Sequence, residues 1–220
     1  WQNPLPQGNY LWDLQLVDAN TLIATGQGGT SMKTIDGGLN WTIFNTGNTK
    51  LLRCAKFLQN GLVGYACGAN ASLIKTTDGG VNWQNLTLNQ EIDLYAMDFP
   101  DEQTGYVAGN PGYIVYKTTD GGSTWSQSDS LDMSSISVIK FPFENLTGFS
   151  SGYQSGTSNG IIYKTTDGGV SWIKKTMPVG CEIKSFWFVN NQIAYAAGYR
   201  TILKTTDYGE NWISIYTGNG

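Results

Sequence analysis

The sequence contains no histidine, and only two arginines, Arg53 and Arg200, occur among its 220 residues. Without histidine, catalytic triads with a histidine base and histidine-ligated metal sites are excluded. Charged residues make up 14% of the chain, whereas roughly 25% is usual in soluble domains. The formal net charge is −4, so no basic surface for nucleic acid or an anionic membrane is expected. No apolar run approaches the roughly 20 residues that cross a bilayer, so membrane insertion is not predicted.

In place of charge, the chain is rich in residues that form turns and strands. It contains 28 glycines, 12 tyrosines and 8 tryptophans, a composition typical of short strands joined by tight turns. Low charge and three cysteines favour a protein that is secreted, or located at the cell surface or in the periplasm. The phosphate-binding pattern G-x-x-x-x-G-K-[ST] is absent, and no cofactor is predicted.

One nonapeptide occurs five times, as KTIDGGLNW, KTTDGGVNW, KTTDGGSTW, KTTDGGVSW and KTTDYGENW. Its aspartates are Asp36, Asp78, Asp120, Asp167 and Asp207, and its tryptophans are Trp41, Trp83, Trp125, Trp172 and Trp212. The copies divide the chain into repeats of about 1–41, 42–83, 84–125, 126–172 and 173–212. A strand-rich repeat of about 40–50 residues predicts an all-β fold, a β-propeller with four-stranded antiparallel blades. The chain is then a single propeller domain or a segment of one.

The nonapeptide has a mechanical explanation. An aspartate at the start of a tight turn accepts hydrogen bonds from the backbone N–H groups of the residues that follow it. The second glycine of each copy can adopt a positive φ, while the tryptophan buries a large flat surface. Calcium loops gather several carboxylates around one ion, but each turn here offers one. The aspartates are therefore predicted to be structural, and no metal site is expected.

The second repeat shows the layout expected of one blade. Its first three strands are expected at 51–58, 62–67 and 72–77, with a fourth that opens at Trp83. Asn60-Gly61 predicts a two-residue type I′ turn, which would place Cys54 directly opposite Cys67. A disulfide between these two residues is predicted, with two reduced, buried thiols as the alternative, and Cys181 is left unpaired.

These residues match the Asp-box pattern, Ser/Thr-x-Asp-x-Gly-x-Thr/Ser-Trp, with asparagine before the tryptophan in three copies. The whole repeat, with G-Y-x-x-G before K-T-T-D-G-G, resembles the propellers of the photosystem II assembly-factor family. It is also similar to secreted Bacteroidota-type proteins built from this repeat. The resemblance covers essentially the whole chain and implies the propeller fold, but a fold does not determine a function.

Three functions remain open. Sialidases also carry Asp boxes but bind their substrate carboxylate with three arginines, and this chain has two. A glycan-active hydrolase would need two other carboxylates, for which the candidates beside first strands are Asp13, Asp93, Asp98 and Glu182. A purely structural spacer is another alternative. The favoured function is a non-catalytic, secreted binding or scaffold module whose partner is a protein or a glycan.

Specific function is expected where the copies differ. With the first strands aligned on Leu16, Phe57, Phe99, Phe141 and Phe188, the columns one and four residues earlier mix charged, aromatic and small residues. The predicted ligand-binding residues are Trp12, Arg53, Tyr95, Lys184, Trp187 and Arg200, because tryptophan, tyrosine and arginine anchor many interfaces. Packing between blades is the alternative for the tryptophans. Trp1 aligns with Trp41, so we also expect the chain to be part of a longer repeat protein.

Overall fold

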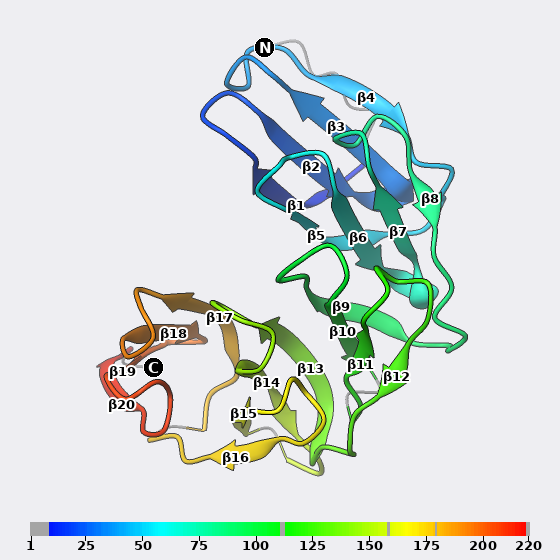
Figure 1. The fold of residues 1–220 in the computed structure, drawn as a ribbon. Coiled ribbons are helices and arrows are strands. Elements are labelled where there is room, and N and C mark those ends of the chain that lie inside the picture. The colour runs from blue at the N-terminus through cyan, green and yellow to red at the C-terminus, as the bar shows by residue number, and fades with distance from the viewer. Residues whose placement is uncertain (1–8, 111–112, 158, 179, 219–220) are drawn as a thin grey trace. The chain divides into compact units, whose positions relative to one another are not determined.

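The computed structural model describes residues 9–110, 113–157, 159–178 and 180–218 (Figure 1). The regular elements in these ranges are β-strands, apart from two short 3-10 turns, η1 (Gln27–Gly29) and η2 (Ala69–Ala71). No helix in the described ranges is long and apolar enough to span a membrane. Trp1 and its predicted alignment lie outside the described residues.

The strands form five sheets of four, and in each sheet the strands follow one another in chain order, as predicted. The strands of the first two sheets are β1 (Leu11–Leu16), β2 (Leu22–Gly26), β3 (Thr30–Thr34), β4 (Thr42–Asn45), β5 (Leu52–Phe57), β6 (Gly64–Gly68), β7 (Leu73–Thr76) and β8 (Gln84–Asn85). Those of the third and fourth are β9 (Asp93–Asp98), β10 (Gly105–Asn110), β11 (Tyr116–Thr118), β12 (Ser126–Gln127), β13 (Met133–Lys140), β14 (Gly148–Gln154), β15 (Gly160–Thr165) and β16 (Ile173–Lys175). The fifth sheet consists of β17 (Ile183–Phe188), β18 (Ala194–Gly198), β19 (Thr201–Thr205) and β20 (Ile213–Thr217).

The chain divides into two compact units. The first comprises Trp1–Gly105 and Thr118–Trp125, and the second comprises Tyr106–Lys117 and Ser126–Gly220. Each unit has its own apolar core. One cluster of the first unit contains Leu52, Ala55, Ala66 and Ile74, and one of the second contains Phe149, Ile162, Ile183, Phe186 and Leu203.

The first hairpin of the second sheet is not the two-residue turn that was predicted. The N–H of Leu58 donates to the carbonyl of Val63, so the loop comprises four residues, 59–62. Gly61 has a φ of +65°, but a type I′ turn needs positive φ at both central residues, and Asn60 does not have one. Asn60 instead accepts, through Oδ1, the N–H groups two and three residues later. The loop is longer by one residue on each side, so the predicted strand register is unchanged.

Four of the first strands, β1, β5, β13 and β17, contain β-bulges. The pairing with the second strand shifts between Leu11 and Asp13, Leu52 and Cys54, Ile136 and Val138, and Ile183 and Ser185. The residues passed over are Trp12, Arg53, Ser137 and Lys184, called the bulge residues below. A bulge redirects the side chain of the extra residue away from the regular alternation of the strand. At four of its five positions, the variable sequence column four residues before the aligned position therefore holds a redirected side chain.

In the second, third and fourth sheets the box tryptophan packs on the aligned first-strand phenylalanine of its own sheet. A Cβ at Gly64 would lie 2.4 Å from Cε1 of Phe57, so glycine leaves room for that ring. The Phe57 ring then meets Trp83 edge to face, at 5.9 Å between centroids and 86°. The same arrangement recurs in Phe99–Trp125 and Phe141–Trp172.

Tyrosines of the second strands connect one sheet to the next within each unit. The Tyr65 ring stacks on Phe99 of the next sheet at 3.5 Å and 7°. Its hydroxyl donates to the carbonyls of Glu102 at 3.0 Å and Gly121 at 3.5 Å. In the second unit, Tyr106 makes the same contacts with Phe141, Asn145 and Gly168. In the G-Y pair of the repeat, the glycine therefore leaves room for a ring of its own sheet, and the tyrosine packs against the next sheet.

Candidate functional site

The Asp boxes are closed, hydrogen-bonded turns. Oδ1 of Asp78 accepts the N–H groups of Val81 and Asn82 and the hydroxyl of Thr76, at 3.1, 2.9 and 2.8 Å. Its Oδ2 accepts the side-chain amide of Asn82 at 2.7 Å. Closely similar bonds surround Asp36, Asp120, Asp167 and Asp207. Because both carboxylate oxygens accept bonds inside the turn, the geometry is that of a structural motif.

These bonds stabilise the charged carboxylates. The backbone N–H and the side-chain amide of Asn40 lower the pKa of Asp36 from 3.8 to about 2. The side-chain hydroxyl and the backbone N–H of Thr124 lower that of Asp120 to about 2 as well. The pKa values of Asp167 and Asp207 are also about 2. A carboxylate that accepts several hydrogen bonds is expected to behave in this way.

The box tryptophans fall into two groups. The indole N–H groups of Trp41, Trp83 and Trp125 donate to the carbonyl of the second box glycine at 3.1–3.2 Å. Those of Trp172 and Trp212 are buried and have no hydrogen-bond partner within the described residues. All five tryptophans lie at their predicted places at the ends of the boxes, and Trp172 and Trp212 are buried.

Both residues that follow the box aspartate adopt positive φ, not only the second as expected. In the second box the values are +74° for Gly79 and +87° for Gly80. The fifth box has Tyr208 at the first position, with a φ of +55°. A left-handed conformation costs a non-glycine residue about 1–2 kcal/mol. The Tyr208 ring packs 5.7 Å from Phe149, and this contact offsets part of that cost.

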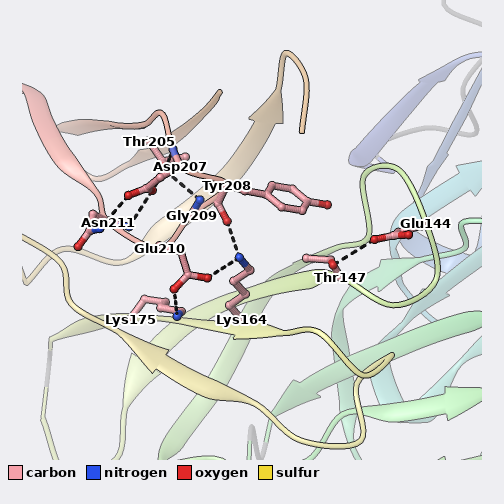
Figure 2. Close-up of polar contacts among 10 residues, drawn as sticks. All are labelled: Glu144, Thr147, Lys164, Lys175, Thr205, Asp207, Tyr208, Gly209, Glu210 and Asn211. Atoms are coloured by element: carbon pink, nitrogen blue, oxygen red, sulfur yellow. Dashed lines mark hydrogen bonds and ion pairs between the residues drawn. The ribbon is translucent and has the colours of Figure 1, made fainter. Parts of the chain in front are cut away.

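In three repeats the first lysine of the nonapeptide reaches the box of the following sheet, a contact named here the lysine latch. Lys164 donates to the Tyr208 carbonyl at 2.7 Å and pairs with Glu210 at 2.7 Å (Figure 2). Lys175 pairs with the other carboxylate oxygen of Glu210 at 2.6 Å. In the first unit, Lys33 donates to the Gly79 carbonyl and Lys75 to the Gly121 carbonyl. The sequence reasoning assigned no role to these lysines, although their recurrence at the start of K-T-T-D-G-G was a usable signal.

The first unit brings three predicted ligand residues together around Arg53. The guanidinium carbon lies 4.3 Å from the centre of the Tyr95 ring and 5.7 Å from that of Trp12. Its Nη2 pairs with Asp93 at 3.3 Å. Asp93 also accepts the backbone N–H of Asn70, which fixes its carboxylate. Because Trp12 is 55% exposed, the cluster is accessible from solvent.

The second unit has a different cluster around the buried Glu182. Its carboxylate accepts the Ser137 hydroxyl and pairs with Lys184 at 2.6 Å. Burial opposes its ionisation, but hydrogen bonds from Lys184, Ser137 and Tyr153 outweigh burial and lower the pKa. The charge of Lys184 is thus balanced by a neighbour, although its side chain remains exposed. Ser137 and Lys184 are both bulge residues, and Glu182 connects them.

The column one residue before the aligned position lies on another face of the sheet. Lys56 and Asp98, two members of that column, form an ion pair at 3.1 Å between neighbouring sheets. Trp187 holds the same position in the last sheet and is 73% exposed. Arg200 lies in the turn between β18 and β19 with a φ of +56°, its guanidinium 5.1 Å from the ring of Tyr199. Neither residue belongs to the Glu182 cluster, and whether both units share one binding surface stays a prediction.

The four acids considered for a hydrolase all have partners. Besides Asp93, Asp98 and Glu182, Asp13 accepts the backbone N–H of Ala55 at 2.7 Å through Oδ2. The contacts of Asp13, Asp93 and Asp98 join neighbouring sheets, which is a structural role.

Cys54 and Cys67 are paired directly across β5 and β6, as the predicted register requires. Their sulfur atoms lie 2.7 Å apart, and both residues are free thiols in this structure. Burial, followed by the hydrogen bond with Cys54, raises the pKa of Cys67. The disulfide stays a prediction, which thiol titration of the denatured, unreduced protein would test.

Known proteins resemble this chain in both sequence profile and fold. Residues 48–134 match the family described as Photosynthesis system II assembly factor YCF48. A structure described as YCF48 bound to D1 peptide aligns with a TM-score of 0.70 at 19% identity, over 95% of this chain and 69% of that one. YCF48 from Cyanidioschyzon merolae aligns with a TM-score of 0.58 at 15% identity, over 96% of this chain and 86% of that one.

Glycoside hydrolases share the architecture as well. The GH74 enzyme of Niastella koreensis aligns with a TM-score of 0.71 at 18% identity, over 94% of this chain but 38% of the enzyme. A search of curated protein sequences finds no match. These identities are too low to transfer an activity, so they establish the fold alone. The chain is an Asp-box repeat protein of β-propeller fold, and one part of it, residues 48–134, is similar to the YCF48 photosystem II assembly-factor family.

Proposed function

We propose that this chain is a non-catalytic protein-binding module whose binding surface includes the cluster of Trp12, Arg53 and Tyr95. The observation that carries the proposal is the guanidinium of Arg53 held between two aromatic rings. The likeness to YCF48, which has been solved with a bound D1 peptide, supports a protein partner.

The arrangement around Arg53 favours recognition of a peptide. Stacking restricts the planar guanidinium before a partner arrives, so less conformational entropy is lost on binding. Asp93 contacts only Nη2, and an arginine offers five N–H donors. A peptide carbonyl or carboxylate can accept from these donors while an apolar side chain covers Trp12. Tryptophan, tyrosine and arginine are also the residue types that contribute most to protein interfaces.

The second unit contributes less to this proposal. Lys184, Trp187 and Arg200 remain candidate contacts, but Lys184 is already paired with Glu182. We also propose that the protein works outside the cytoplasm, because its charge is low and its composition is typical of secreted repeat proteins. Fractionation of the source cells tests this location, and recovery in the cytosol would contradict it.

Binding to a peptide array and a glycan array, in parallel, tests the function. For peptides that bind, Arg53→Lys should weaken affinity about tenfold, since lysine keeps the charge but loses the planar stack. Trp12→Ala should also weaken binding without lowering the unfolding temperature. Leu39→Ser, at an exposed position of the first box, is the matched control and should bind normally. Equal binding by all three variants, or binding to glycans alone, would refute the proposal.

A further inference from the structure

The two cysteines of the second sheet lie beside the bulge that carries Arg53. Cys54 of β5 is paired directly with Cys67 of β6, and Arg53 is the residue passed over next to that pair. The two sulfur atoms lie 2.7 Å apart, and both residues are free thiols. Directly opposed residues have Cα atoms about 4.5–5.5 Å apart, which lies within the range that a disulfide spans. A disulfide can therefore form here without a change of strand register.

The second sheet differs from the other bulged sheets at the pair that follows the bulge. In those sheets the corresponding pairs are Asp13–Thr25, Val138–Ser151 and Ser185–Ala197. None of these pairs contains a cysteine, so none can be cross-linked. The cysteines instead lie beside Arg53, whose guanidinium contacts Trp12, Tyr95 and Asp93. Two opposed thiols thus coincide with the bulge residue that has the most extensive set of contacts, and all of these residues belong to the first unit.

The position of the bulge determines which side chain is redirected. A shift of the bulge by one residue towards the start of β5 would redirect Leu52 in place of Arg53. Leu52 is completely buried in an apolar cluster of its own sheet, and this burial opposes such a shift. A shift in the other direction would place Arg53 opposite Cys67 and redirect Cys54. Cys54 is partly exposed, so burial opposes this second shift less.

We propose that Cys54 and Cys67 are a site of reversible thiol–disulfide exchange, and that the disulfide fixes the bulge that directs Arg53 to Tyr95 and Asp93. The bond requires Cys54 to remain opposite Cys67, so it forbids the shift that burial in the core does not prevent. In the dithiol form that shift is allowed, and the guanidinium leaves the ring and the carboxylate for part of the time. An effect on a binding partner rests on the function proposed above for this cluster, whereas the effect on Arg53 does not.

The oxidant is the disulfide of a small thiol. The thiolate of Cys54, which is partly exposed, attacks one sulfur of that disulfide and releases the other half as a thiolate. The thiolate of the buried Cys67 then attacks Sγ of Cys54 and releases the second small thiol. Two protein thiols are oxidised to one disulfide while the small disulfide is reduced to two thiols, and the two protons pass to the released thiolates. An excess of a dithiol reverses the exchange.

The two arginines of the chain allow a test that needs no binding partner. The 220-residue chain is treated with oxidised glutathione or with dithiothreitol, and alkylation of the denatured protein counts the free thiols. Phenylglyoxal then modifies the arginines, and peptide mapping follows Arg53 and Arg200 separately. The oxidised protein should retain one free thiol, at Cys181. Its Arg53 should react about threefold more slowly than in the reduced protein, because the guanidinium spends less time away from its partners. Arg200, in the second unit, should react alike in both forms.

A variant without the two thiols is the matched control. It carries Cys54→Ala and Cys67→Ala, since alanines occupy the corresponding positions of the third sheet, Ala96 and Ala108. Far-ultraviolet circular dichroism checks that it is folded. Its Arg53 should react at the same rate after either treatment, and a rate that still depends on the treatment would overturn the proposal.

Three results for the wild type would also overturn the proposal: no disulfide in the folded protein, equal reactivity of Arg53 in the two forms, or a change at Arg200 as large as that at Arg53. Peptide-array binding by the oxidised and reduced forms separates this inference from the proposed function. If Arg53 responds to the treatment but no peptide binds either form, the proposed function fails and the effect of the disulfide on Arg53 stands.

Discussion

The hydroxyl of Tyr65 offers a direct measure of how strongly neighbouring sheets are joined. Tyr65→Phe removes the bonds to the carbonyls of Glu102 and Gly121 but keeps the ring stacked on Phe99. The site is completely buried, so water cannot replace the lost donor. The Gly121 carbonyl still accepts the hydrogen bond from Lys75, so the Glu102 carbonyl is the acceptor that loses its bond from the tyrosine without this replacement. A net cost of about 1 kcal/mol follows, which lowers the unfolding temperature by about 2–4 °C in a chain of this size.

Matched positions in the same protein provide the comparison. Tyr106→Phe removes equivalent bonds in the second unit, at 3.0 and 3.1 Å, and should cost a similar amount. Tyr195→Phe changes the same position in the last sheet, where the hydroxyl makes no such bonds among the described residues of its own unit, and should cost less. Phe149 occupies this position naturally in the fourth sheet, so phenylalanine is compatible with the fold.

Urea unfolding followed by tryptophan fluorescence and circular dichroism measures these differences. The reasoning is refuted if Tyr195→Phe destabilises the protein as much as Tyr65→Phe, or if neither Tyr65→Phe nor Tyr106→Phe has an effect. Ionisation provides an independent check. Burial, with the nearby Glu102 and Asp101, raises the pKa of Tyr65 well above its ordinary value. Alkaline spectrophotometric titration should therefore show Tyr65 protonated after exposed tyrosines have ionised.

Three other outcomes are expected. In the folded protein, the pKa of Asp207 and of three other box aspartates is about 2 rather than 3.8. The charged carboxylates therefore stabilise the fold above pH 3.8, and this contribution is lost as the pH falls towards 2. Calorimetry should show the unfolding temperature falling over this range, and a constant unfolding temperature would contradict the prediction. Lys164→Met should lower the free energy of unfolding, measured in urea, by about 1–2 kcal/mol, because the part-buried Tyr208 carbonyl loses a charged donor. An unchanged midpoint would show that the latch adds nothing. Gly209→Ala should cost more than Gly80→Ala, since an added Cβ lies 2.3 Å from the ring of Phe149 in the first case but makes ordinary contacts in the second; equal costs would mean that positive φ alone matters.

Much of the architecture could be predicted because it depends on short-range chemistry. The spacing of the box aspartates predicted five four-stranded sheets, since each turn needs only the residues from Thr76 to Asn82, or their counterparts, to close. The register of Cys54 opposite Cys67 could also be counted from the turn, although the turn type was wrong. Asn60 and Gly61 can satisfy their local preferences in either a two-residue or a four-residue loop, and only the surrounding strands decide between them.

The candidate site was predicted in part. Trp12, Arg53 and Tyr95 were singled out because they vary between repeats, and the structure brings them together. The β-bulges at Trp12 and Arg53 could not be predicted, because a bulge depends on the pairing of two strands. Trp187 was selected because it is also a large aromatic residue, but it lies on a different face of its sheet. The equivalent position in the second sheet is Lys56, which forms an ion pair with Asp98.

The repeated motif by itself determined the sheets, the box turns and the aromatic core, because residues a few positions apart can make these contacts in any copy. Only the tertiary structure decided how one copy meets the next. The lysine latch and the tyrosine bonds join atoms about 40 residues apart in sequence. Identical motifs therefore acquire different surroundings. Lys75 donates to a box carbonyl, whereas Lys164 donates to a box carbonyl and also pairs with Glu210. The difference arises because hydrogen bonding and ion pairing depend on which residues the neighbouring sheet presents.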